Sequence, residues 1–112
     1  MSTFVQDSLI DAQPLVRPTG ATIQERFESF HTGNGWIYRA FESLIEAWLA
    51  KGNTRVGMKA LGEKVRWEYG MRVSPNERFA LNNDYLSRYA RLLIAEHPEL
   101  EGVILTRELR AA

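Results

Sequence analysis

The chain has no cysteine and only two histidines, His31 and His97. The lack of cysteine excludes disulfide bonds, thiolate metal sites and a cysteine nucleophile. No Ser/His/Asp spacing singles out either histidine as a catalytic base. We therefore expect that the protein is not an enzyme and uses no cofactor. His97 is more simply a helix-end residue favoured by the helix dipole. Glu42 and Glu46 could share a metal ion, but a solvated helix face explains them better, so we expect no metal site.

Long apolar runs are also missing. No stretch approaches the roughly 20 residues that a membrane-spanning helix needs, and no signal peptide opens the sequence. We therefore expect no membrane association and a cytoplasmic location. The 45% hydrophobic content of the 112 residues is enough for a core, and this length is typical of one compact domain.

The chain carries no net charge, because 14 basic residues balance 14 acidic ones. The distribution is uneven, with three bases and six acids in residues 1–50, nine and four in 51–91, and two and four in 92–112. The three segments therefore carry −3, +5 and −2. A basic middle segment can present one positive face. Internal pairing of these charges across the fold is an equally good interpretation.

Capping residues and apolar spacing predict two helices in the first half. Thr22 and Glu25 form the capping-box pattern that starts the first. Asn34 caps the second, at 36–51, and Gly52 suits the left-handed position after its last turn. The second has the clearest apolar stripe in the chain. The expected buried positions are Ile23, Phe27 and Phe30, then Ile37, Ala40, Phe41, Leu44, Ile45, Trp48 and Leu49.

Two more helices are predicted in the second half. The third runs from about 56 to 69, where Gly70 closes it, and Gly62 within it permits another helix to approach closely. The fourth, at 83–97, starts at an asparagine cap and ends before Pro98. The expected buried residues are Met58, Leu61, Val65 and Tyr69 in the third helix, and Leu86, Tyr89, Ala90, Leu93 and Ile94 in the fourth. Tyr85 could join them, with the tyrosine hydroxyls at the rim of the core.

The remaining segments predict a small β element and an arm. Residues 71–73 and 79–81 flank a turn at Pro75 and fit a hairpin or an ordered loop. Residues 103–105 are typical of a strand. Residues 1–20 lack a sustained period and are expected to form an N-terminal arm, either disordered or wrapped around the domain, with 21–112 as a single domain. The expected fold is mainly α with a small β element, a compact four-helix domain of winged-helix or helix-turn-helix type.

The third and fourth helices match the plan of a helix-turn-helix reader, in which the later helix lies in the major groove of DNA. Arginine can pair with guanine, and serine can bond bases or phosphates. We therefore hypothesise nucleic-acid binding, with double-stranded DNA as partner. The linker is long for the simplest version of this motif. An ordinary helical domain with solvated or paired arginines is the alternative. The candidate binding residues are Lys59, Arg66, Ser87, Arg88 and Arg91.

Arg66-Trp67-Glu68-Tyr69 places two aromatic residues and a base within four positions. Trp67 could stack on a nucleic-acid base, although a tryptophan in such a position more often fills the joint between helices. We therefore expect a structural role for Trp67.

Arg66-Trp67-Glu68, followed by Asn82-Asn83, Tyr85, Tyr89-Ala90-Arg91-Leu92 and Pro98, resembles a group of small uncharacterised proteins encoded by bacteriophages and prophages. The resemblance covers about residues 27–107. It implies a phage origin, a compact domain and the cytoplasm of a host cell, but no activity.

The alternative function is a protein-interaction module that acts on a host or phage protein without nucleic acid. In that case residues 1–20 and exposed aromatic side chains such as Trp36 and Tyr38 would form the contact.

Overall fold

The computed structural model describes residues 10–73 and 81–105. This part of the chain is mainly helical with a small β element, as predicted. The expected turn at Pro75 lies outside the described residues. Along the chain the elements are α1 (Ile23–Gly33), α2 (Gly35–Ala50), β1 (Val56–Gly57), α3 (Met58–Arg72), α4 (Asn83–Glu96), the 3-10 helix η1 (Pro98–Leu100) and β2 (Ile104–Leu105).

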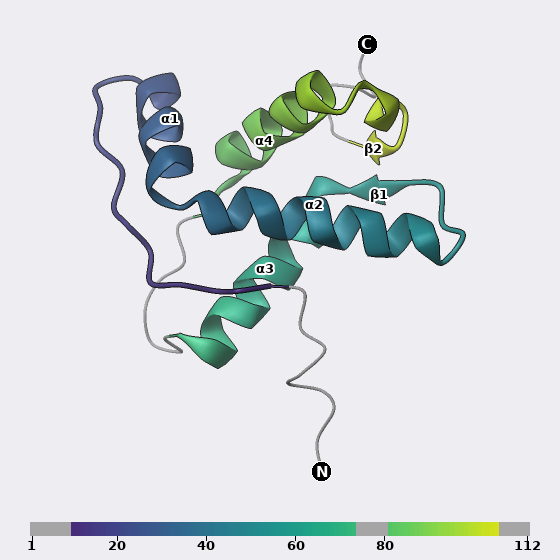
Figure 1. The fold of residues 1–112 in the computed structure, drawn as a ribbon. Coiled ribbons are helices and arrows are strands. Elements are labelled where there is room, and N and C mark those ends of the chain that lie inside the picture. Colours follow the sequence, from purple (N-terminus) through teal and green to yellow (C-terminus); the bar gives the residue numbers. More distant parts are fainter. Residues whose placement is uncertain (1–9, 74–80, 106–112) are drawn as a thin grey trace.

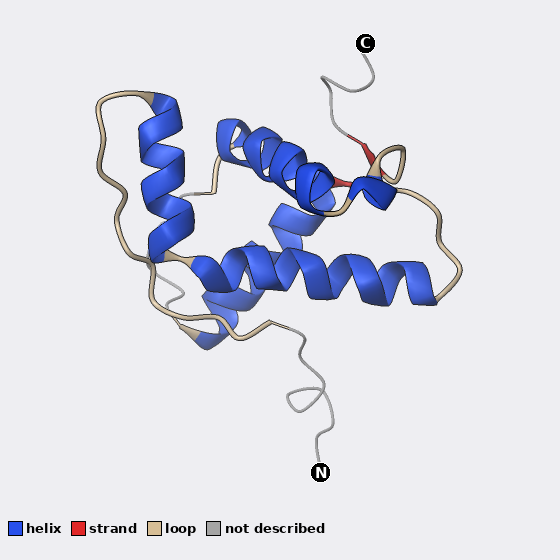
Figure 2. Ribbon diagram, turned by 45° about the horizontal axis from the view of Figure 1, so that its top comes forward, coloured by secondary structure: helices blue, strands red, loops and turns tan. Residues whose placement is uncertain are grey.

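The α2 helix runs across the centre of the molecule in Figure 1, with α1 and α4 above it and α3 extending below it. Helices make up most of the described chain, and the only strands drawn for this part are short (Figure 2). The core lies where α2 meets the other three helices. Aromatic rings of Phe27, Phe41 and Tyr89 meet there edge to face, with centroids 4.8 Å apart for Phe27–Tyr89 and 5.2 Å for Phe41–Tyr89.

The two described strands pair in parallel, with Val56 opposite Ile104. The predicted strand at 103–105 is thus confirmed at its last two residues, whereas its partner strand just before α3 was not predicted. Parallel strands cannot be joined by a tight turn, so this pair is not the hairpin of a winged-helix domain. Met71 and Arg72, expected in a hairpin or an ordered loop, instead continue α3 beyond Gly70.

Local capping explains where α1 and α4 begin and where α2 ends. Thr22 accepts a hydrogen bond from the Glu25 amide at 3.1 Å, and the Glu25 carboxylate accepts one from the Thr22 amide at 3.1 Å. Asn82 accepts a bond from the Tyr85 amide at 2.9 Å and starts α4. Gly52 follows α2 with φ of 96°, in the region that favours glycine. These three predictions are confirmed.

Asn34 is completely buried and does not cap α2 with its side chain, contrary to expectation. Its amide nitrogen donates to the carbonyls of Val16 and Phe30, each at 2.9 Å, and its amide oxygen accepts from the Val16 amide at 2.8 Å. The corner between α1 and α2 therefore holds the chain that precedes α1. Ile10, earlier in this segment, is buried in the core.

For four aromatic or aliphatic side chains, the observed burial is the reverse of the prediction. Trp36 and Tyr38 are buried, whereas Ile23 is 40% exposed and Trp48 is 43% exposed. Helix α2 contacts α1 on one side and α3 on another, so more than one stripe of it is covered. The Trp36 ring accordingly stacks near Tyr69 of α3, at 6.2 Å between centroids. A single apolar stripe in the sequence cannot reveal this two-sided packing.

The expected close approach at Gly62 is confirmed. A Cβ atom on Gly62 would lie 2.9 Å from Cδ2 of Leu86, well inside van der Waals contact. The absence of a side chain at this point lets α4 lie directly against α3. By contrast, a Cβ on Gly70, two turns later in α3, would meet nothing within 4 Å.

We expect Gly62→Leu to lower the free energy of unfolding by about 1–3 kcal/mol, because the added atoms overpack the contact with Leu86. Gly70→Leu is the matched control, and its better helix propensity should leave stability equal or raise it by up to about 1 kcal/mol. Urea unfolding followed by circular dichroism measures both. Equal effects at the two positions would contradict a close α3–α4 crossing.

Candidate nucleic-acid interface

The contact of Gly62 with Leu86 brings the candidate residues Lys59 and Arg66 of α3 to the neighbourhood of α4. Lys59 and Arg66 lie three residues before and four residues after Gly62, so both share its side of α3. Ser87 directly follows Leu86 on α4. Lys59 and Arg66 are exposed, and Ser87 is partly exposed. The two helices therefore present polar side chains on either side of their contact.

Arg88 and Arg91 occupy the outer side of α4, three residues apart, opposite the buried Leu86, Tyr89 and Leu93. Arg91 is exposed and Arg88 is partly exposed. Nε of Arg88 donates to the side-chain oxygen of Gln24 in α1, at 2.9 Å. This contact directs Arg88 toward α1. Because the Gln24 amide is neutral, the positive charge of Arg88 stays uncompensated by this partner.

Arg66 is paired with an acid on its own helix. Its Nη2 lies 2.6 Å from Oε1 of Glu63, and both side chains are more than half exposed. An ion pair of this kind is worth about 0–1 kcal/mol and can be exchanged for another anion.

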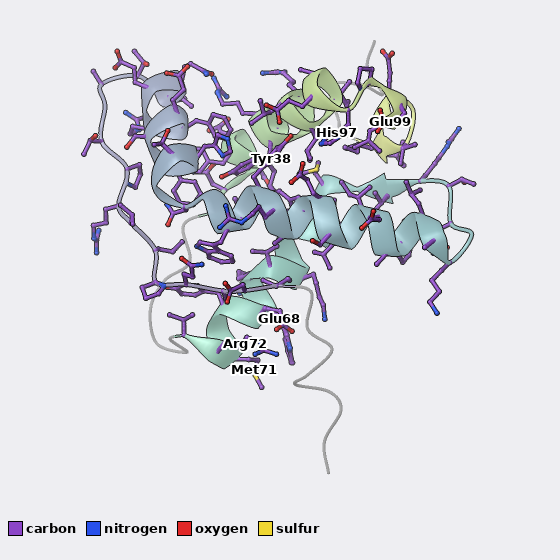
Figure 3. The ribbon with its side chains drawn as sticks, viewed as in Figure 1. Tyr38, Glu68, Met71, Arg72, His97 and Glu99 are labelled. Carbon is purple, nitrogen blue, oxygen red and sulfur yellow. The ribbon has the colours of Figure 1, made fainter. Side chains whose placement is uncertain are left out.

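Internal pairing accounts for other cations of the basic middle segment. On the other side of α3, Glu68 lies 3.7 Å from Nζ of Lys64 and 2.8 Å from Nε of Arg72. Figure 3 shows Glu68 and Arg72 together near the end of this helix. One acid on this side of α3 thus pairs with two of the cations of the basic middle segment.

Trp67 does not fill a joint between helices, as we had expected. Its side chain is 64% exposed, and Met71, one turn later on α3, is 69% exposed. The buried side of α3 is formed by residues such as Leu61, Val65 and Tyr69, and Trp67 lies on the side away from them. The two side chains leave a pair of large apolar groups in solvent.

A second group of polar residues joins α2 to the end of α4. Tyr38 donates a hydrogen bond to the Glu96 carboxylate. Nε2 of His97 lies 2.8 Å from a Glu42 oxygen, and Nδ1 lies 3.8 Å from a Glu99 oxygen. Figure 3 shows Tyr38, His97 and Glu99 in one region of the molecule. His97 does end α4 as predicted, but its bond to Glu42 depends on helix packing and has no signal in the sequence.

The expected places of Tyr85 and Tyr89 in the core are confirmed, but the Tyr89 hydroxyl does not reach the rim. It is buried and has no hydrogen-bond partner among the residues that the structure describes. Burial raises the pKa of Tyr89. Burial also raises the pKa of Tyr38, and its bond to the negatively charged Glu96 raises it further.

Within residues 10–73 and 81–105, histidine and acidic side chains do not gather in a group of three or more that could hold a metal ion. None of the helices in these two ranges has the length and apolar character needed to cross a membrane.

Comparisons with protein-family models, with curated protein sequences and with solved structures found no match to this chain. The resemblance to phage-encoded proteins therefore stays a prediction.

We expect the free energy of unfolding to fall as the pH rises above about 10, the ordinary pKa of tyrosine. The unfolded chain releases the Tyr38 and Tyr89 protons near that pH, whereas the folded chain retains them, so the unfolded state gains stability. Each tyrosine contributes a slope of up to about 1.4 kcal/mol per pH unit. Urea unfolding between pH 8 and about pH 11 measures this slope. The variant Tyr38→Phe with Tyr89→Phe should lose that part of the slope, and an unchanged slope would contradict the assignment.

Proposed function

We propose that this protein binds nucleic acid, with double-stranded DNA as the partner, through the outer side of α4 and the neighbouring part of α3. The observation that carries the proposal is the outer side of α4, where Arg88 and Arg91 lie three residues apart and are partly or fully exposed. The contact of Gly62 with Leu86 brings Lys59 and Arg66 of α3 to the adjacent helix. Helix α4 is the docking element. The binding residues are Lys59, Arg66, Ser87, Arg88 and Arg91.

The chemistry of these side chains suits a phosphate backbone. Arg91 and Arg88 supply charged donors from one helix, and the Ser87 hydroxyl can donate to a phosphate oxygen beside them. Arg66 would exchange its exposed bond to Glu63 for a phosphate at small cost. Because Arg66 and Arg88 already have partners within the chain, the affinity should be modest and strongly dependent on salt.

The relation to the helix-turn-helix motif is limited to its general plan. In that motif a turn of three or four residues joins the two helices. Here residues 73–82 separate α3 from α4. We therefore propose that α4 docks on DNA, and we assign no particular groove to it.

We expect Arg88→Ala with Arg91→Ala to weaken binding to a fluorescein-labelled DNA duplex, because two phosphate contacts are lost. Fluorescence anisotropy at a series of salt concentrations measures the affinity. The slope of log K against log salt should decrease in magnitude by about 0.9 for each contact, or about 1.8 for the pair.

The matched control is Lys51→Ala with Arg55→Ala, which removes the same charge from the exposed segment after α2. The control should keep a slope close to that of the unmodified protein. Equal losses in the two double variants would indicate general charge attraction, and unchanged binding by Arg88→Ala with Arg91→Ala would rule out the proposed surface.

A second candidate function is a protein-interaction module, and the exposed pair of Trp67 and Met71 favours it. Large apolar groups that adjoin on a surface are often protein contact sites. Trp36 and Tyr38, the aromatic residues first expected to make such a contact, are buried and cannot do so. Trp67 and Met71 would take their place.

For this second candidate we expect a bacterial protein that co-purifies with the chain to remain bound after nuclease treatment. Trp67→Ala with Met71→Ala should abolish its capture, because the apolar contact is lost. Val16→Ala with Ile23→Ala, at other exposed apolar positions, is the control and should retain it. Capture that is lost on nuclease treatment, or is retained by the Trp67 and Met71 variant, would contradict this function.

A further inference from the structure

A groove lies between the second half of α2 and the turn that follows α4. Its volume is about 380 Å³. Three aliphatic side chains line its deeper part: Ile45 and Leu100 are buried, and Leu49 is partly buried. None of the residues assigned to nucleic-acid binding lines this groove, so it is a separate feature of the molecule.

The edge of the groove is acidic. Glu42, Glu46 and Glu99 all line it, and no lysine or arginine does so among the described residues. Glu46 and Glu99 are exposed, and Glu42 is partly exposed. The protein as a whole is neutral, so three carboxylates around one hollow are a local excess of negative charge.

Contacts within the described chain do not neutralise this charge. His97 bonds to Glu42 at 2.8 Å and lies 3.8 Å from Glu99. Glu46 forms no hydrogen bond or ion pair with any residue of the described ranges. It also follows Glu42 by four residues on α2, a spacing at which like charges repel. A cation placed beside Glu46 and Glu99 would relieve this repulsion.

We propose that the groove binds a basic and apolar segment of a partner protein, in which an aliphatic residue adjoins an arginine or lysine. The aliphatic side chain would contact Ile45, Leu49 and Leu100. The cation would lie at the edge between Glu46 and Glu99. This occupant follows from charge complementarity with the edge and from the apolar deeper part. The hollow is within the range of about 300–1,000 Å³ found for binding pockets, and it is large enough for a few side chains.

A peptide fits this groove better than a small free cation does. Small-ligand pockets bury most of their ligand, about 70–90% of its surface. Here the charged edge is exposed to solvent, so a small cation would stay largely hydrated. The aliphatic part needs a partner of its own, and the stem and neighbours of a peptide arginine can supply it.

The test uses the labelled peptide acetyl-Ala-Leu-Arg-Ala-Leu-Arg-amide, measured by fluorescence anisotropy with the full chain. A matched peptide carries citrulline, a neutral residue of nearly the same shape, in place of each arginine. We expect the arginine peptide to bind at least about fivefold more tightly, because the citrulline peptide loses both ion pairs. Equal binding of the two peptides, or no binding of either, would overturn the proposal.

Variants of the protein locate the site. Glu46→Gln with Glu99→Gln should weaken binding of the arginine peptide by about five- to tenfold. Asp11→Asn with Glu28→Gln removes the same charge elsewhere and should not weaken it. Amide NMR signals of Ser43, Leu49 and Leu100 should shift on binding.

Three results would overturn the proposal. These are equal losses in the two double variants, NMR shifts confined to α3, and equally tight binding of arginine amide alone, which would indicate a site for small cations.

Discussion

The buried side chain of Asn34 is the interaction on which the arrangement of the first two helices depends. It bonds to three backbone groups on Val16 and Phe30, and the bond to the Phe30 carbonyl is buried. The fully buried amide of Asn34 would itself cost about 1–3 kcal/mol if it were left without partners. The angle at the α1–α2 corner is therefore fixed by an amide rather than by apolar packing alone. That angle also places Gln24 of α1 beside Arg88, so the position of α1 affects the candidate surface.

Helix α4 connects the two charged regions of the molecule. Its buried side meets aromatic rings from α1 and α2, including Phe27 and Phe41, and this packing fixes its position. Its outer side carries Arg88 and Arg91, whereas its last turn ends in Glu96, where a negative charge opposes the helix dipole. The bond from Tyr38 offsets that cost. One helix thus presents cations along its outer side and contributes to an acidic region at its end.

Much of the fold could be predicted because the signals are local. The capping box at Thr22 and the cap at Asn82 each depend on a few neighbouring residues. Two of the failures share a cause. Trp36 and Tyr38 were expected outside the core because one apolar stripe was assumed for α2, and Trp67 was expected inside it because tryptophan is usually buried. In both cases the number of helices packed around the side chain decided whether it is buried. The spacing of residues along one helix does not reveal that number.

The sequence by itself determined the presence of the four helices, the side-chain caps at Thr22 and Asn82, the absence of thiol chemistry and the identity of every charged residue. Only the tertiary structure decided which charges on different helices meet. Arg66 adjoins Glu63 by helical spacing, but the bond of His97 to Glu42 joins residues from two different helices. The parallel pairing of Val56 with Ile104 is of the same kind. The physical reason is that capping and helical spacing act over a few residues, whereas grooves and surfaces form where distant segments pack together.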